Sequence, residues 1–325
     1  MRRRHFRAIA FRRTRADSAR PERVGSANVQ IAMETALNSA TERYRARFRK
    51  VLDYIETHLD DDLCAERLSA VAAFSPYHFQ RQFSASFEVA VFKYVQLARL
   101  KRASYALAFR TDSPVGDIAL DSGYEGAEAF ARAFKKTFGQ TPSEFRESPH
   151  WDVWHATYRS VRTMRSRYMT PNLRIDDVRI VDVEPIGVAV LEHRDHPNAM
   201  GASTRRFIEW RRQNGLPPRT SATYNVVYKH TDDDCHYDLC AATERDVPEN
   251  AAGVVRKTIP GGRCALLRHV GTEDALGTAV NFVYATWLPQ SGEELRDFPL
   301  YFHRVNLFPD VPEHEWITDI YLPLR

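Results

Sequence analysis

Three side chains with hydrogen-bonding groups share one face of a predicted helix. Tyr77, Gln80 and Arg81 stand at spacings of three and four, which brings side chains together on one side of a helix. Phe79 and Phe83 fall on the opposite side, where they would pack inward. Arginine can form paired hydrogen bonds with guanine, and glutamine with adenine, in the major groove of DNA. The outward face therefore has the chemistry that contact with base edges requires.

The residues before this helix predict a sharp turn. A short apolar helix is predicted over residues 65–72, and the chain breaks at Phe74. Ser75 is a favourable N-cap and Pro76 suits the first position of a helix, so a second helix restarts at once. Two short helices joined in this way form a helix-turn-helix unit.

A second unit with the same layout follows. Its first short helix leads to a turn at Gly123, a residue that suits a positive φ angle. The next predicted helix, over residues 125–138, places phenylalanines inward at every fourth position. A long predicted helix over about residues 91–109 joins the two units. The outward side chains of the second unit are Glu128, Arg132, Lys135 and Lys136.

The two units, the helix between them and the segment 139–146 resemble the DNA-binding domain of the AraC/XylS family of transcription regulators. The resemblance covers about residues 44–148. It implies that the second helix of each unit enters the major groove, and that the joining helix sets the distance between them.

Carried over position by position, the resemblance implies which residues contact DNA. The implied contacts are Tyr77, Gln80 and Arg81 in the first unit, and Ala127, Glu128, Ala129, Arg132, Lys135 and Lys136 in the second. Glu88 and Val91 replace the glycine and proline that the family usually has after the first unit. The second unit therefore offers few base-reading side chains, and the start of the joining helix is less well marked.

Charge is unevenly distributed along the chain. Residues 1–169 hold 29 Lys+Arg and 19 Asp+Glu, whereas residues 170–325 hold 17 and 23. This asymmetry predicts an anionic partner for the N-terminal half, and the resemblance implies that this partner is double-stranded DNA. No apolar run reaches the roughly 18 residues that span a bilayer, and none follows the basic N-terminus as in a secretory signal. Four scattered cysteines do not make a disulfide framework, so a cytoplasmic protein without a membrane partner is expected.

The first 32 residues are rich in arginine and show no helical period. Pro21 and Gly25 interrupt them, and Met33 opens the first helix-like stretch. We expect residues 1–32 to form a disordered basic tail. The alternatives are a start codon placed too early and an arm that follows DNA phosphates.

From residue 173 the chain changes from helical periodicity to short β-branched runs. The predicted domains are the double helix-turn-helix domain over residues 33–150, an Arg- and Ser-rich linker over 151–172, and an α+β domain over 173–325. The expected fold class is therefore multidomain: an all-α domain followed by an α+β domain of duplicated β-α-β-β units.

The duplication is visible in the spacing of similar residues. His193 and His269 are 76 positions apart, and Trp210 and Trp287 are 77 apart, as are Tyr224 and Tyr301. Such a repeat predicts two units related by a pseudo-twofold axis. The seam between them is a natural place for a ligand.

This half resembles the GyrI-like (gyrase-inhibitor-like) effector-binding domain over about residues 173–325. The matching segments are 260–262 (Pro-Gly-Gly), 287–292 (Trp-Leu-Pro-Gln-Ser-Gly) and 318–324 (Thr-Asp-Ile-Tyr-Leu-Pro-Leu). The resemblance implies a hydrophobic, often cationic ligand in an aromatic pocket at the seam. The candidate pocket residues are Tyr224, Tyr228, Phe282, Tyr284, Trp287, Tyr301, Phe302 and His303.

The charge of such a ligand stays open at this point. An acidic residue of the final strand pair often meets the ligand's positive charge in this family. Here residues 300–305 contain no carboxylate, and His303 stands in its place. The alternatives are a neutral effector, an anionic effector and no effector at all.

One group of residues has the side chains of a metal site but not its spacing. It comprises His230, Asp232, Asp233, Asp234, Cys235, His236 and Cys240. The spacing fits no structural zinc pattern, and the aspartates are predicted to form a solvated hairpin turn. We therefore predict no metal and no cofactor.

These observations predict a transcription regulator that binds DNA and is not an enzyme. A small hydrophobic ligand and RNA polymerase are its expected further partners. One alternative is a hydrolase that uses the C-terminal pocket, with the DNA-binding domain only localising it. Another is an interaction protein whose C-terminal half contacts a second protein.

Overall fold

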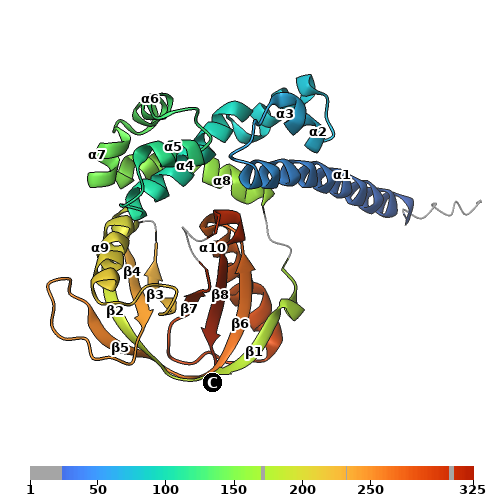
Figure 1. Cartoon of the computed structure of the whole chain (residues 1–325). Coiled ribbons are helices and arrows are strands. Elements are labelled where there is room, and N and C mark those ends of the chain that lie inside the picture. The colour runs from blue at the N-terminus through green and yellow to red at the C-terminus, as the bar shows by residue number, and fades with distance from the viewer. Residues whose placement is uncertain (1–23, 170–172, 232, 307–310) are drawn as a thin grey trace, which may run out of the picture. The chain divides into compact units, whose positions relative to one another are not determined.

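The computed structural model describes residues 24–169, 173–231, 233–306 and 311–325 (Figure 1). Most of the predicted basic tail, residues 1–23, lies outside this range. No helix in the described ranges is both long and apolar enough to cross a membrane.

Eight helices follow one another in residues 24–169, the described part of the N-terminal half. They are α1 (Val24–Thr57), α2 (Ala65–Val71), α3 (Pro76–Phe87), α4 (Val91–Phe109), α5 (Val115–Asp121), α6 (Ala127–Phe138), α7 (Pro142–Glu147) and α8 (Trp151–Tyr168). The two predicted helix-turn-helix units are thus α2–α3 and α5–α6, with α4 between them. Helix α4 starts at Val91, as predicted. The Val91 side chain is buried, so it holds the first turn of α4 against the core although no proline marks this position.

Helix α1 begins earlier than expected. Residues 24–32 were expected in the disordered tail, but the helix starts at Val24. The chain has no proline between Pro21 and Pro76, so nothing in it stops a helix over this stretch. Farther along α1, Val51, Leu52 and Ile55 are fully buried in the core of the first unit.

The predicted linker is also largely helical. Helix α8 occupies 151–168, and Trp154 and Tyr158 are buried in the core of the second unit. The Tyr158 hydroxyl donates to the Leu97 carbonyl oxygen at 2.9 Å, and Arg165 Nη2 donates to Glu56 Oε2 at 2.7 Å. Arg159 and Arg162 are exposed on this packed helix, whereas Arg165 is buried. Residues 170–172, the end of the predicted linker, lie outside the described range.

The C-terminal half is one antiparallel sheet of eight strands. They are β1 (Val178–Val183), β2 (Ile186–Asp195), β3 (Thr223–His230), β4 (Cys235–Ala242), β5 (Val255–Ile259), β6 (Gly262–Val270), β7 (Tyr301–Arg304) and β8 (Ile317–Pro323). The spatial order is β1-β6-β8-β7-β3-β4-β2-β5. Strands β3 and β7 pair at the centre, so the order is symmetric about the two repeats.

Each repeat has one strand more than the three predicted. Each of these extra strands pairs with a strand of the other repeat. Strand β1 precedes the first repeat but pairs with β6 of the second. Strand β5 precedes the second repeat but pairs with β2 of the first. The predicted repeat of strand, helix, strand and strand is otherwise present, and the edges of the sheet interlock the two copies.

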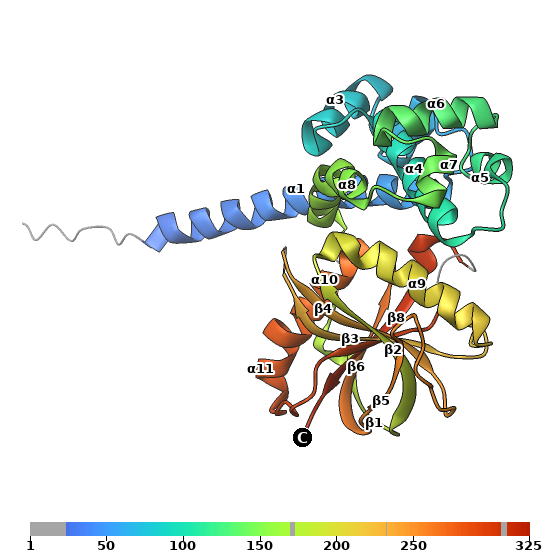
Figure 2. The same ribbon diagram turned by 90° about the vertical axis from the view of Figure 1, so that its left-hand side faces the viewer.

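Helices α9 (Met200–Gln213) and α10 (Glu273–Phe282) pack over different halves of the sheet on one of its faces (Figure 2). The repeated histidines join strand to helix in both copies. His193 Nδ1 lies 2.9 Å from Ser203 Oγ of α9, and His269 Nε2 lies 3.2 Å from the Thr272 carbonyl oxygen before α10. We call the opposite face of the sheet the inner face. Its apolar floor consists of Val188, Val190, Val226, Cys240, Ile259, Cys264 and Tyr301.

Candidate nucleic-acid interface and effector site

Helix α3 presents the predicted polar face to solvent. Ser75 caps it, because its side-chain oxygen accepts from the His78 N–H at 3.4 Å, and Pro76 opens the first turn. Phe79 and Phe83 are fully buried, whereas Tyr77 is 62% exposed. Gln80 and Arg81 are exposed beside it.

The exposed side chains of α3 support one another. The Arg81 guanidinium lies 4.8 Å from the centre of the Tyr77 ring, a cation–π contact. The ring restrains the long arginine side chain but leaves its hydrogen-bond donors exposed. This lowers the entropy that Arg81 would lose on contact with a base.

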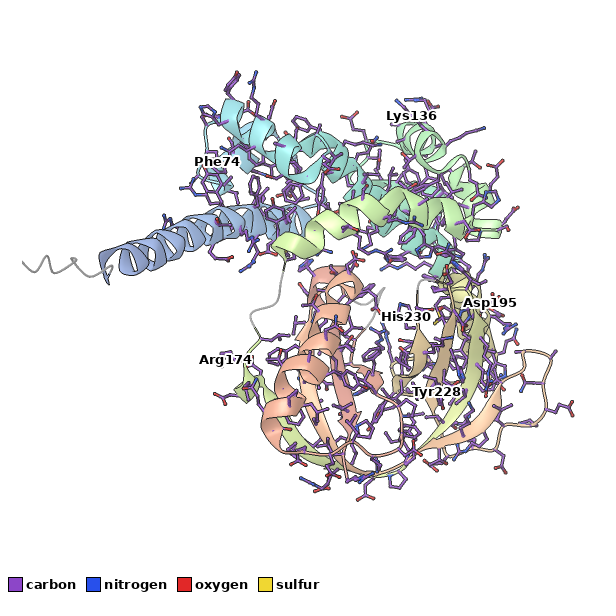
Figure 3. The ribbon with its side chains drawn as sticks, turned by 180° about the vertical axis from the view of Figure 1, so that it is seen from behind. Phe74, Lys136, Arg174, Asp195, Tyr228 and His230 are labelled. Carbon is purple, nitrogen blue, oxygen red and sulfur yellow. The ribbon has the colours of Figure 1, made fainter. Side chains whose placement is uncertain are left out.

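Helix α6 has the same division between a buried and an exposed face. Phe130, Phe134 and Phe138 are buried, as predicted. The outward side chains Glu128, Arg132, Lys135 and Lys136 are all exposed, and Ala127 is exposed with them, while Ala129 is half-buried. Lys136 projects from the outer side of α6 (Figure 3).

Charges on and near α6 favour an anion. Arg132 Nη1 is 3.7 Å from Glu128 Oε2, and both side chains are mostly exposed, so this pair holds the arginine only weakly. Burial, and then the positive charge of Lys136, lower the pKa of Lys93 on α4. The positive charges of Lys93 and Lys136 thus act on each other beside the exposed face of α6.

The two exposed helices lie on the same side of α4 in both Figure 1 and Figure 2. This is the arrangement that contact of α3 and α6 with one side of a DNA duplex needs.

The turn before α6 depends on Gly123. Its φ angle is +72°, and a Cβ there would lie 2.7 Å from the Leu59 carbonyl oxygen. Arg99 holds this carbonyl, because its Nε donates to Leu59 O at 2.9 Å and its Nη2 to Asp61 O at 2.8 Å. The sequence analysis missed Arg99, since only the fold brings it to a loop about forty residues earlier.

The segment 139–146 closes the second unit rather than extending its exposed face. The buried Gln140 side chain donates to Ser148 O and accepts from the His150 N–H, both at 2.9 Å. Thr141 and Glu144 cap α7 reciprocally, with bonds of 2.7 and 3.2 Å. Phe145 is fully buried.

The candidate effector residues divide between the two faces of the sheet. Tyr224, Tyr228, Tyr301 and His303 lie on the inner face. Phe302 points to the other face, because successive strand residues alternate, and packs in the helix-side core with Trp287 and Phe282. Tyr284 lies in the π-helical turn Val283–Trp287, 39% exposed. Phe282, Tyr284, Trp287 and Phe302 therefore do not lie on the inner face with the other four candidates.

Aromatic rings of the inner face stack in three pairs. Tyr224 lies over His303 at 4.7 Å between ring centres, Tyr301 over Tyr321 at 4.9 Å, and Tyr228 over His236 at 4.2 Å. Figure 3 shows Tyr228 on this side of the curled sheet. Burial lowers the pKa of both His236 and His303, so both rings are uncharged at neutral pH.

The inner face also carries two buried carboxylates that the sequence analysis missed. Asp238 and Asp319 are 1% and 4% exposed. Lys257 Nζ is 2.8 Å from Asp238, and Arg268 binds Asp319 with two bonds of 2.7 and 2.8 Å. Residues 300–305 contain no acid, but Asp319 lies beside His303 on the neighbouring strand β8.

The predicted hairpin between β3 and β4 holds most of the potential metal ligands. Cys235 and Cys240 are buried in β4, and Cys235 Sγ lies 3.6 Å from His230 Nδ1. Asp233 and Asp234 are exposed at the turn, while Asp232 is outside the described residues. Across the described part of the chain, no group of three such side chains is arranged to hold a metal ion.

Comparison with known proteins assigns both halves. Residues 68–148 match the family model of a helix-turn-helix domain, and residues 176–325 match that of a GyrI-like small molecule binding domain. The chain is 37% identical over 153 residues to the "Probable transcriptional regulator YgiV" of Escherichia coli (strain K12), covering 46% of this chain and 96% of the relative. The chain belongs to the GyrI-like family.

The helix-turn-helix half of this GyrI-like protein is of the AraC type, and the whole is a transcription regulator with a DNA-binding and an effector-binding domain. It is also 38% identical over 106 residues to the "Right origin-binding protein" of Escherichia coli (strain K12), covering 33% of this chain and 36% of that one. Among solved structures, a cryo-EM structure of "EcmrR-DNA complex in EcmrR-RPo" covers 80% of this chain and 98% of that chain, with 12% identity and a TM-score of 0.40.

Proposed function

We propose that this regulator reads a specific DNA sequence with α3 and α6. The observation that carries the proposal is the pair of exposed polar helix faces, each backed by fully buried phenylalanines. Tyr77, Gln80 and Arg81 are the readers of the first unit. Glu128 and Arg132 are those of the second, and Lys135 and Lys136 contact phosphates. The protein works in the cytoplasm, with RNA polymerase as its protein partner.

The inner face of the sheet is the proposed effector site. Three stacked aromatic pairs line it. Tyr301 is buried in its floor, but the pairs Tyr224–His303 and Tyr228–His236 are partly exposed and offer flat apolar surface to a small hydrophobic molecule. An effector changes DNA binding only if it prefers one state of the protein over another. The proposed output is therefore a difference in operator affinity between the free and the effector-bound protein.

A hydrolase on the inner face is a weaker reading. A general base needs a free carboxylate with a raised pKa. Here Glu192, Asp238 and Asp319 are each bonded to a cation, and the hydrogen bond from Lys257 lowers the pKa of Glu192. These carboxylates hold cations in place, so we propose a sensor and not an enzyme.

Selection of bound sequences from a random duplex library at near-physiological salt tests the DNA-binding proposal. The wild type should enrich a motif with two half-sites about one helical turn apart. The double variant Arg81→Ala, Arg132→Ala should lose it, since each arginine faces solvent without a strong ion pair. A motif that is the same for both proteins would show that the readers are misassigned.

A further inference from the structure

The two repeats place a carboxylate at equivalent positions of the inner face. Asp238 lies on β4 opposite Val226 of β3, and Asp319 lies on β8 opposite His303 of β7. Both are almost fully buried. A buried carboxylate without a partner would attract any cation that reached this face, because burying an unpaired charge is costly.

The first repeat neutralises its carboxylate with a lysine from the exchanged edge strand. Lys257 of β5 places Nζ 2.8 Å from Asp238 Oδ2 and 2.6 Å from Glu192 Oε1. Burial opposes the charge of this lysine, but its bonds to Asp238 and Glu192 outweigh burial and raise its pKa. The Tyr228 hydroxyl donates to the same Asp238 oxygen at 3.3 Å, so the acid is covered by a cation and a ring.

The second repeat reaches the same result with a different residue. Arg268 of β6 stands directly beside Asp319 in the sheet, at the position that Glu192 of β2 occupies in the first repeat. Its Nε and Nη2 bind both carboxylate oxygens. The lysine comes from an edge strand and the arginine from an inner one, yet each acidic position ends with a bound cation.

Three carboxylates of this surface each have a cation as partner. Glu192, Asp238 and Asp319 are paired with Arg194, Lys257 and Arg268, since Arg194 Nε donates to Glu192 Oε2 at 2.9 Å. We propose that Lys257 and Arg268 determine the ligand specificity of the inner face. Their positive charges neutralise Asp238 and Asp319, so the face excludes organic cations and binds uncharged aromatic ligands. This inference rests on the proposed effector role of the same face.

The test compares two probes of similar shape and different charge. Triphenylphosphine oxide is uncharged, methyltriphenylphosphonium is a cation, and both carry three phenyl rings. Titration of the full chain with each, at one ionic strength, should give at least about tenfold tighter binding of the oxide to the wild type. Arg268→Met should raise the affinity for the phosphonium about tenfold and leave the oxide nearly unchanged, because Asp319 then lacks its cation.

Two control variants separate charge from shape. Arg268→Lys keeps a cation beside Asp319 and should keep the wild-type preference. Arg268→Met combined with Asp319→Asn removes both charges and should lose the gained affinity for the phosphonium. Arg268 is chosen first because its side chain is 51% exposed, and the double variant leaves no unpaired buried charge if the single one unfolds.

The outcomes distinguish the inference from the function on which it rests. Equal or tighter binding of the phosphonium by the wild type would overturn the exclusion of cations, while the effector site itself would stand. The same holds if Arg268→Met folds and gains no affinity for the cation. If neither probe binds the wild type or any variant, the proposed effector site is wrong and the inference falls with it.

Discussion

The two helix-turn-helix units follow the same backbone path with different residues at its two tightest points. Before α6 and after it, the chain adopts positive φ angles at Gly123 (+72°) and Gly139 (+74°). Before α3 and after it, the positive φ angles fall on Ala73 (+53°) and Glu88 (+54°). Glycine adopts this conformation without steric cost, whereas other L-residues lose about 1–2 kcal/mol there.

The comparison shows how packing can dictate a turn that the local sequence disfavours. In the first unit, Phe79, Phe83 and Phe87 are buried in one cluster with residues of α1 and α4, and this burial offsets the strain at both ends of α3. The second unit has glycines at both positions, so it has less backbone strain for packing to offset. Glu88 thus ends α3 in the same left-handed conformation in which Gly139 ends α6.

Replacing Gly123 with alanine should have the largest effect. The new Cβ would meet the Leu59 carbonyl oxygen and the Arg99 side chain at 2.7–2.8 Å, in addition to the strained φ. We expect the free energy of unfolding, measured in urea, to fall by about 3 kcal/mol. Gly139→Ala is the matched control, since nothing lies within 4 Å of its Cβ, and it should lose only about 1 kcal/mol. Equal losses would show that the close contact at Gly123 does not matter.

The two exposed faces should also differ in how sharply they read sequence. Arg81→Ala removes a guanidinium that Tyr77 orients, and should cost about 2 kcal/mol on the preferred duplex and blur one base position. Arg132→Ala should cost less, because its ion pair with Glu128, at 3.7 Å, holds the guanidinium only weakly. Competition binding with single-base variants of the selected site measures both. A larger loss for Arg132→Ala would reverse the assignment of the stronger reader.

Glycine in the first unit should release the strain described above. Glu88→Gly should raise the free energy of unfolding by about 1 kcal/mol, because the φ of +54° then has no steric cost. Glu88→Ala keeps the strained angle and should bring no comparable gain. If the glycine variant is less stable than the wild type, the left-handed end of α3 is not strained.

The smallest effect is expected for Lys136, whose proposed contact with a phosphate does not depend on the DNA sequence. Lys136→Ala should weaken binding to all duplexes alike and make the slope of log affinity against log salt shallower by about one. Lys136 is exposed on α6 and has no role in its core, so stability should be unchanged. Loss of preference at one base position in this variant would move Lys136 into the reading set.

Features set by residues close together in the sequence were predictable, whereas features set by contacts between distant residues were not. The start of α3 was predictable because Ser75 and Pro76 act within one turn, and the buried faces of α3 and α6 because phenylalanines recur at helical spacing. Helix α8 was missed because His150 gives it no side-chain cap and its apolar residues are spaced among arginines. Its burial depends on Leu97 and other residues far away in the chain.

The residues that share the inner face were predicted less well because this face depends on strand neighbours. Tyr301 and His303 share the inner face and Phe302 does not, a distinction that alternation could have supplied once β7 was placed. Asp238 and Asp319 lie far apart in the chain, on β4 and β8. Their meeting with Lys257 and Arg268 required pairings between strands, and no spacing in the sequence specifies those pairings.

The exchange of β1 and β5 also bears on how the C-terminal half is put together. Cutting the chain between β4 and β5 would leave each copy holding an edge strand that belongs to the other, so neither could complete its own four strands. A single copy would have to borrow this strand from a second molecule, as in a swapped dimer. In the fused chain, the two copies are therefore expected to fold and unfold as one cooperative unit. The inner face that carries Asp238 and Asp319 forms only when both copies are present.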